Sequence, residues 1–182
     1  MKRSFALIAM LAVSATAAYA QPTASLPSGF TFVDWLTHGR TNVQLGRGLV
    51  DESNKLFYFK EKEVAGFQSW YIFFDPSGSQ RVRGTVTFDS QISSLITTTA
   101  GMLAGDVLYG VSAVSYGSQS AMGLEVSDVA TFANNVLTFD FPASDPGDHI
   151  RVLTRVPEPS SLALLALGLS AMGVASRRRR HR

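Results

Sequence analysis

The chain contains no cysteine. Disulfide bonds, thiolate metal sites and a cysteine nucleophile are therefore excluded, and a folded domain must be stabilised by packing alone. Histidine is also scarce: neither His38, His149 nor His181 stands in a metal-ligand spacing, and no serine stands in a G-x-S-x-G motif. We therefore expect no cofactor and no catalytic activity, with a secreted hydrolase as the less favoured alternative.

Charged residues make up only 16% of the sequence, and the basic ones are concentrated at the two ends. The formal charge of the whole chain is +2, yet residues 21–156 contain thirteen acidic and nine basic side chains, which is a formal charge of −4. A nucleic-acid-binding domain needs lysine and arginine clustered on its own surface. Nucleic acid is therefore excluded as a partner of the central region.

The first twenty residues have the three parts of a secretory signal peptide. A basic start at Lys2 and Arg3 is followed by an apolar run over residues 5–18, which ends in Ala18-Tyr19-Ala20. Small residues at these positions predict cleavage between Ala20 and Gln21. An N-terminal core helix is the disfavoured alternative. We expect residues 1–20 to be removed and the exported domain to cover residues 21–155.

Residues 156–182 form a second three-part pattern. Pro157, Glu158 and Pro159 come first, and an apolar segment follows over residues 162–175. The chain then ends in a basic cluster of Arg177, Arg178, Arg179, Arg180, His181 and Arg182. A helix over this segment would span about 21 to 26 Å, which is marginal for a hydrocarbon core of about 30 Å but tolerated through flanking residues and bilayer thinning.

The basic cluster predicts the orientation of that helix. Positive charges stay on the cytoplasmic side, so we expect a transmembrane helix in the inner membrane with the central domain on the far side. A C-terminal helix buried in the domain is the alternative. It is disfavoured because the arginines beside it would have no acidic partners.

This terminal pattern resembles the PEP-CTERM sorting signal of exported proteins from Gram-negative bacteria that make extracellular polysaccharide. The resemblance covers residues 156–182. It implies recognition by an exosortase, a membrane cysteine protease that cuts near Pro157-Glu158-Pro159, and delivery to the cell surface or extracellular matrix. A helix that remains as a permanent anchor, without processing, stays open as an alternative.

The central region is also similar to uncharacterised domains found on such proteins. This resemblance rests on residues 83–89 and residues 140–154. It implies no known activity.

Short apolar or alternating runs separated by turn residues predict an all-β domain, an antiparallel β-sandwich or jelly-roll-like fold. The predicted strands are residues 30–36, 43–50, 56–60, 70–74, 82–88, 107–116, 122–126, 136–141 and 150–153. Helix is the weaker alternative over residues 91–103 or 127–132, although Ile96 among threonines favours extended backbone. Residues 21–29 are expected to be a loose arm and residues 154–161 a linker.

Two groups of side chains offer binding functions. Asp140, Asp145 and Asp148 lie close together in sequence and would supply carboxylate oxygens to Ca²⁺, although turn formation by aspartate is the favoured interpretation. Tyr58 and Trp70 lie in aromatic strands and would form an exposed platform for sugar rings, although burial of both strand faces is the favoured outcome.

The leading interpretation is an exported structural or adhesive protein of an exopolysaccharide or biofilm matrix. Its expected partners are an exosortase, the inner membrane and exopolysaccharide. A carbohydrate-binding module is the first alternative.

Overall fold

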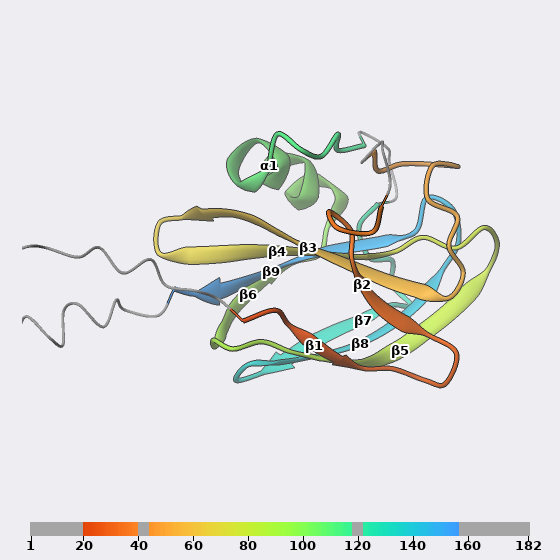
Figure 1. Ribbon diagram of the computed structural model, residues 1–182, viewed down its shortest axis with the longest axis horizontal. Coiled ribbons are helices and arrows are strands. Elements are labelled where there is room, and N and C mark those ends of the chain that lie inside the picture. The colour runs from red at the N-terminus through yellow and green to blue at the C-terminus, as the bar shows by residue number, and fades with distance from the viewer. Residues whose placement is uncertain (1–19, 40–43, 118–121, 157–182) are drawn as a thin grey trace, which may run out of the picture. The chain divides into compact units, whose positions relative to one another are not determined.

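The described residues are 20–39, 44–117 and 122–156, and in this computed structural model they form nine strands and one helix (Figure 1). The all-β class that the sequence predicts is confirmed. The elements are β1 (Thr23–Ser25), β2 (Thr31–Asp34), β3 (Lys55–Val64), β4 (Phe67–Phe74), β5 (Gln80–Thr87), β6 (Ile92–Ile96), α1 (Thr99–Tyr109), β7 (Val129–Ala133), β8 (Val136–Ala143) and β9 (Asp148–Arg155).

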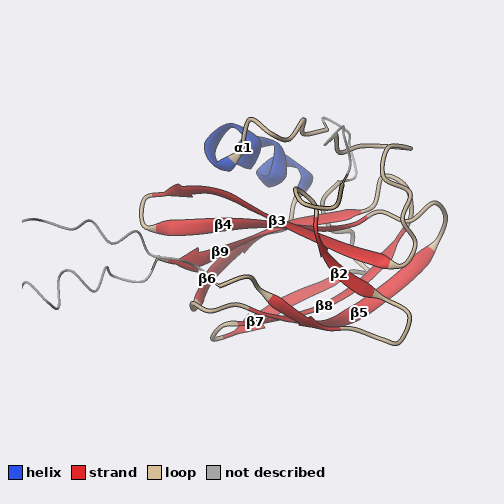
Figure 2. Ribbon diagram, viewed as in Figure 1, coloured by secondary structure: helices blue, strands red, loops and turns tan. Residues whose placement is uncertain are grey.

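The strands form two sheets that face each other across a shared core (Figure 2). One sheet has the order β1-β5-β8-β7 and the other the order β2-β3-β4-β9-β6. Every pairing between named strands is antiparallel except that of β2 with β3, which is parallel. Two facing sheets give the layered arrangement of a β-sandwich.

The five-stranded sheet is buried on both faces. Along β4, Trp70, Ile72 and Phe74 point into the core between the sheets, whereas Tyr71 and Phe73 point into a second core on the other face. Alternation along a strand explains this division, because successive side chains leave opposite faces. Helix α1 lies over the second face (Figure 2), and Met102 packs there with the loop residues Leu45 and Val114.

The one helix begins after Ile96, where the sequence turns from branched residues to alanine, glycine and leucine. Thr98 caps it by accepting a hydrogen bond from the Gly101 amide at 3.1 Å. Helix was the weaker alternative for two segments. Residues 91–103 are divided between β6 and α1, so that the alternative holds there in part. It does not hold for residues 127–132, because Val129–Ala133 forms strand β7.

Three predicted strands are wrong. The described part of residues 43–50 is a loop with one isolated bridge, from Gln44 to Ser115, and its two glycines have positive φ angles. Residues 107–116 contain the end of α1 and a turn, and residues 122–126 form a loop. The apolar residues of the first two segments, such as Leu45 and Val114, are buried against the outer face of the five-stranded sheet without pairing as strands.

The two segments expected to be irregular are partly strand. Thr23–Ser25 pairs with β5, where Gly84 permits the approach because a Cβ at that position would lie 2.3 Å from the Ser25 carbonyl oxygen. Thr154 and Arg155, expected to begin a linker, still belong to β9. Ordered backbone therefore reaches close to both predicted processing points.

Candidate functional site

Strand β9 leads directly to the predicted sorting motif. It lies between β4 and β6, and its last pairs join Arg155 to Phe67 and Thr154 to Gln68. The Arg155 amide donates to the Gln91 carbonyl at 2.9 Å, and the Val156 amide donates to the Gly66 carbonyl at 3.0 Å. The backbone is therefore held by the sheet up to the residue before Pro157.

The N-terminal processing point lies near the same part of the sandwich. The Ala20 amide donates to the Asp89 carboxylate at 3.0 Å, and Asp89 lies two residues before Gln91, which holds Arg155. Figure 1 shows the first and last described residues at the same end of the two sheets. The β5–β6 connection therefore holds both ends of the exported domain.

Comparison with known proteins bears on the C-terminal end. Residues 155–180 match the family model of the PEP-CTERM protein-sorting motif. The chain carries a PEP-CTERM sorting signal. The resemblance that the sequence predicts is confirmed, and the motif supports sorting of an exported protein by an exosortase. No curated protein and no solved structure shows significant similarity to this chain.

The motif residues themselves lie outside the described part of the chain. This holds for Pro157, Glu158 and Pro159, for the apolar segment over residues 162–175, and for the terminal arginines 177–180 and 182. The described residues include no helix long and apolar enough to cross a membrane. Residues 1–19 of the predicted signal peptide also lie outside the described part of the chain. Ala20 and Gln21, which flank the predicted cleavage point, are described.

The middle of β9 carries a buried charge network. Arg151 donates from Nε to Glu61 at 2.8 Å and from Nη2 to both Glu61 at 3.0 Å and Asp106 at 2.5 Å, while Nη1 donates to the Met102 carbonyl at 2.5 Å. The side chains of Arg151 and Glu61 are fully buried. This network joins β9, β3 and α1.

Polar and aromatic groups complete the network around Glu61. Ser69 donates to one carboxylate oxygen at 2.6 Å and Tyr116 to the other at 2.8 Å. The Arg151 guanidinium also lies 4.7 Å from the centre of the Tyr71 ring and 5.5 Å from that of Tyr116. A cation over an aromatic face is attracted by the ring.

The pKa shifts in this network follow from burial and pairing. Burial opposes the charge on Arg151, but the hydrogen bonds that Arg151 donates to Glu61 and the negative charge of that carboxylate outweigh it, and the pKa of Arg151 is raised. Burial raises the pKa of Asp106, and the Arg151 charge opposes this shift only in part. Burial also raises the pKa of Tyr71 well above its ordinary value. Arg151, Glu61 and Tyr71 are buried and Asp106 is partly exposed, and the charged groups of this network are occupied by one another.

The two histidines in the described part of the chain, His38 and His149, are packed among core side chains. His149 is buried, with Nδ1 3.1 Å from the Tyr71 hydroxyl and Nε2 2.9 Å from the Pro146 carbonyl. Burial lowers the pKa of His149 to about 4, so the ring is neutral at physiological pH. His38 is half-buried and meets the Phe57 ring edge-on. Their contacts are those of packed core side chains.

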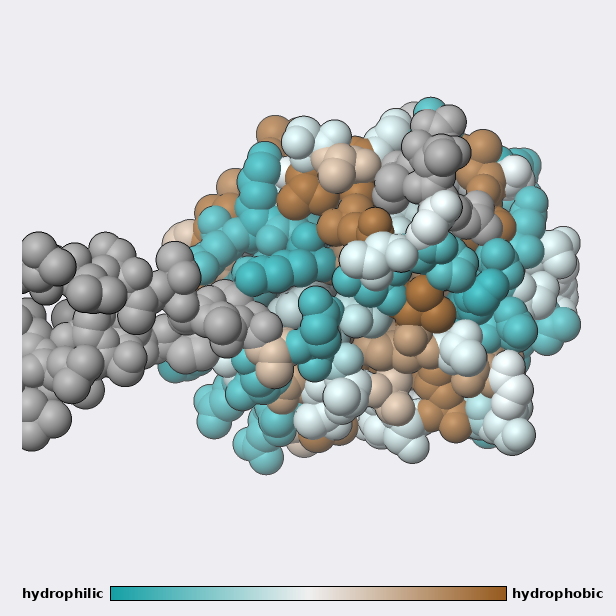
Figure 3. Space-filling model, viewed as in Figure 1, coloured by the Kyte–Doolittle hydropathy of each residue, from teal (hydrophilic) through white to brown (hydrophobic). Residues whose placement is uncertain are grey.

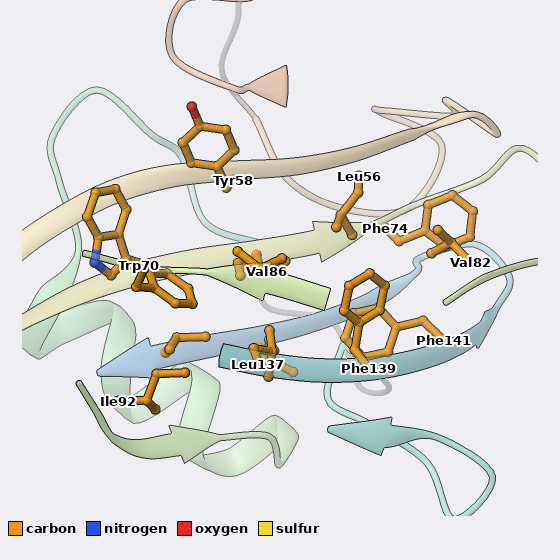
Figure 4. Packing of buried hydrophobic residues seen from close by; sticks show 14 of the residues in the cluster. Leu56, Tyr58, Trp70, Phe74, Val82, Val86, Ile92, Leu137, Phe139 and Phe141 are labelled. Carbon is orange, nitrogen blue, oxygen red and sulfur yellow. The ribbon is translucent and has the colours of Figure 1, made fainter. Parts of the chain in front are cut away.

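The predicted sugar-binding platform is wrong. Tyr58 is 7% exposed and Trp70 is 1% exposed, and both belong to the core between the two sheets (Figure 4). Tyr58 stacks on Phe32 with ring centres 4.2 Å apart, and the Trp70 indole donates to the Thr154 hydroxyl at 3.2 Å. The favoured outcome, burial of both strand faces, is what the structure shows.

The three predicted calcium ligands do not come together. Asp140 forms a bidentate pair with Arg81, with bonds of 2.7 and 2.6 Å, which lowers the pKa of Asp140. Asp145 accepts from the Gly48 amide at 2.8 Å. Asp148 instead meets Glu125 and Asp128, and each of these three offers a carboxylate oxygen within 4.8 Å of the others. Sequence proximity fails here because β8 and β9 belong to different sheets.

Sequence reasoning missed the partners of both clusters. Alternation does place Glu61 on the same strand face as Phe57 and Phe59, which was a readable signal for a buried acid. Its partner Arg151 lies 90 residues away, with no motif to join them. Glu125 and Asp128 form a turn whose distant partner, Asp148, only the fold reveals.

Proposed function

We propose that this chain is an exported structural or adhesive protein, delivered by an exosortase to the cell surface or to an exopolysaccharide matrix. One observation carries the proposal: the PEP-CTERM signal begins where the sandwich ends, directly after a strand that the sheet holds to its last residue. Such a junction presents the processing motif next to a folded, stable cargo.

The arrangement of the two ends supports export through a membrane-held precursor. Ala20 and Arg155 are both held by the β5–β6 connection, so a leader and a C-terminal membrane helix would emerge from the same end of the sandwich. Both segments are expected in the inner membrane. The domain would then stand on the far side of that membrane.

The contents of the domain support a structural role. The buried Arg151–Glu61–Asp106 network and His149 are occupied by contacts within the protein. β7 is an edge strand of its sheet, and its Val129 and Phe132 side chains are 44% and 42% exposed. We therefore propose that the surface of the domain contacts the matrix and that its buried polar groups carry out no catalysis.

Fractionation of the producing bacterium tests this proposal. We expect the wild-type protein in the exopolysaccharide fraction, and release of the protein when that polysaccharide is digested. A Glu158→Ala variant with both flanking prolines replaced by alanine should instead remain with the inner membrane. The matched control replaces Ser160 and Ser161 with alanine, and we expect it to be sorted normally.

Two outcomes would contradict the proposal. If the Pro-Glu-Pro variant is sorted normally, sorting by an exosortase through this motif is contradicted. Wild-type protein that is exported but washes freely from the polysaccharide would remove the matrix role while leaving the sorting intact.

A further inference from the structure

Three carboxylates meet at the end of the sandwich opposite the processing points. Asp148 is the first residue of β9, and Glu125 and Asp128 lie in the turn before β7. Each offers an oxygen within 4.8 Å of the other two. Oxygens on opposite sides of one Ca²⁺ are about 4.6 to 5.2 Å apart, because each lies about 2.3 to 2.6 Å from the ion.

The turn is held in place by backbone contacts on both sides. The Met122 carbonyl accepts from the His149 amide at 2.9 Å, and the Leu124 amide donates to the Thr97 carbonyl at 2.7 Å. The Glu125 amide donates to the Asp128 carboxylate, and the Ser127 hydroxyl donates to the other oxygen of that carboxylate at 3.1 Å. Glu125 and Asp128 are thereby positioned against β9.

The environment of Asp148 is a second observation that points to a bound cation. The residue is only 2% exposed, and its buried Oδ2 atom has no hydrogen-bond partner. Within the described part of the chain, no lysine or arginine forms an ion pair with Asp148, Glu125 or Asp128. A buried carboxylate beside two others is costly unless a cation or a proton compensates for it.

The electrostatics agree with this geometry. Burial, followed by the charges of Asp128 and Glu125, raises the pKa of Asp148 to about 8. In the absence of a cation, Asp148 would therefore hold a proton at neutral pH. A divalent ion would take the place of that proton and neutralise the neighbouring charges.

We propose that Glu125, Asp128 and Asp148 form a calcium-binding site that ties the turn before β7 to the start of β9. Since β7 and β9 belong to different sheets, the ion would clamp the two layers together. Asp148 and Arg155 stand at opposite ends of β9, about 23 Å apart at about 3.3 Å per residue. The site would thus lie at the end of β9 away from Arg155.

Calorimetric titration of the full-length chain in mild detergent tests the site, with CaCl₂ and MgCl₂ in separate runs. We expect Ca²⁺ to bind with a dissociation constant on the order of 10⁻⁴ to 10⁻³ M, the range of extracellular calcium modules, and more tightly than Mg²⁺. At a Ca²⁺ concentration about 100 times that constant, the unfolding equilibrium constant should fall about 100-fold relative to EGTA.

Variants distinguish this site from other acidic groups. Glu125→Gln and Asp128→Asn each remove a ligand charge from the turn, and we expect each to weaken Ca²⁺ binding at least about tenfold. Their unfolding in EGTA checks that they fold. Asp140→Asn is the matched control, because Asp140 is paired with Arg81 and should not affect the titration.

The proposal is overturned if Ca²⁺ gives neither binding heat nor a shift in unfolding, in which case a shared proton satisfies Asp148. Binding that survives both turn substitutions overturns the location. Binding of Mg²⁺ as tight as that of Ca²⁺ overturns the assignment to calcium.

Discussion

At the scale of single residues, Arg151 has the most consequential environment in the domain. Its guanidinium is fully buried, and its hydrogen bonds reach two carboxylates and a backbone carbonyl. Removing one partner from such a network leaves the other charge buried without compensation. Arg151 should therefore contribute to stability far more than a surface arginine does.

Arg151→Met is expected to lower the free energy of unfolding by about 3 to 5 kcal/mol, because Glu61 loses its cation. Adding Glu61→Leu should restore part of the loss, since the orphaned charge is removed as well. Arg155→Met, on the exposed end of the same strand, is the control and should change stability by less than about 0.5 kcal/mol. Urea unfolding measures all three. A loss below about 1 kcal/mol for Arg151→Met would show that the network is not a stabilising unit.

At the scale of elements, the packing of α1 on the sheet depends on the Arg151 side chain beneath it. Gly105 is buried where the helix crosses Arg151, and a Cβ there would lie 2.6 Å from Nη1 of that arginine. Leu103, Val107 and Leu108 stay exposed on the helix, and Figure 3 shows hydrophobic residues gathered in this region of the surface. The missing side chain at position 105 lets the helix approach the sheet.

Gly105→Ala is expected to destabilise the domain by about 1 to 3 kcal/mol, because the added methyl group displaces the arginine. In an ordinary helix the same change would stabilise by about 1 kcal/mol. The sign of the effect is therefore diagnostic. Ala104→Gly at the neighbouring exposed position should cost about 1 kcal/mol through helix propensity alone. Thermal unfolding that shows Gly105→Ala to be stabilising would refute the close packing of α1 on Arg151.

The elements also show where sequence reasoning succeeds and fails. β5 and β8 were predicted nearly to their ends because their alternation is imposed by one buried face, as with Val82 and Val86. The segment around Leu45 looked equally strand-like, but its apolar side chains cover the outer face of a sheet as a loop. A short apolar run indicates burial and leaves the backbone conformation open.

The candidate sites also differ in whether the sequence alone could predict them. The sorting signal was predictable because motif, apolar segment and basic cluster are contiguous, and residues 155–180 match the family model. The Glu125–Asp128–Asp148 group was not, because it joins the turn before β7 to the start of β9, about twenty residues further along the chain. The exposed aromatic platform was not found, because alternation along a strand does not show whether a second layer covers one of its faces. The face that carries Trp70 is covered by the other sheet.

At the scale of the whole molecule, the sorting motif and the folded domain occupy consecutive segments of the chain. Residues 155–180 carry the sorting motif, and the described domain before it is a two-sheet structure whose Arg151–Glu61–Asp106 network is satisfied by contacts within the protein. Both ends of that domain are held by the β5–β6 connection, and the proposed calcium site stands at the other end of β9.

The most direct test is the intact mass of the protein recovered outside the inner membrane of exosortase-producing cells. We predict a product that begins at Gln21 and ends within or beside Pro157-Glu158-Pro159, with any added group attached there. A recovered product that still carries the apolar segment and the terminal arginines through Arg182 would contradict sorting by exosortase cleavage.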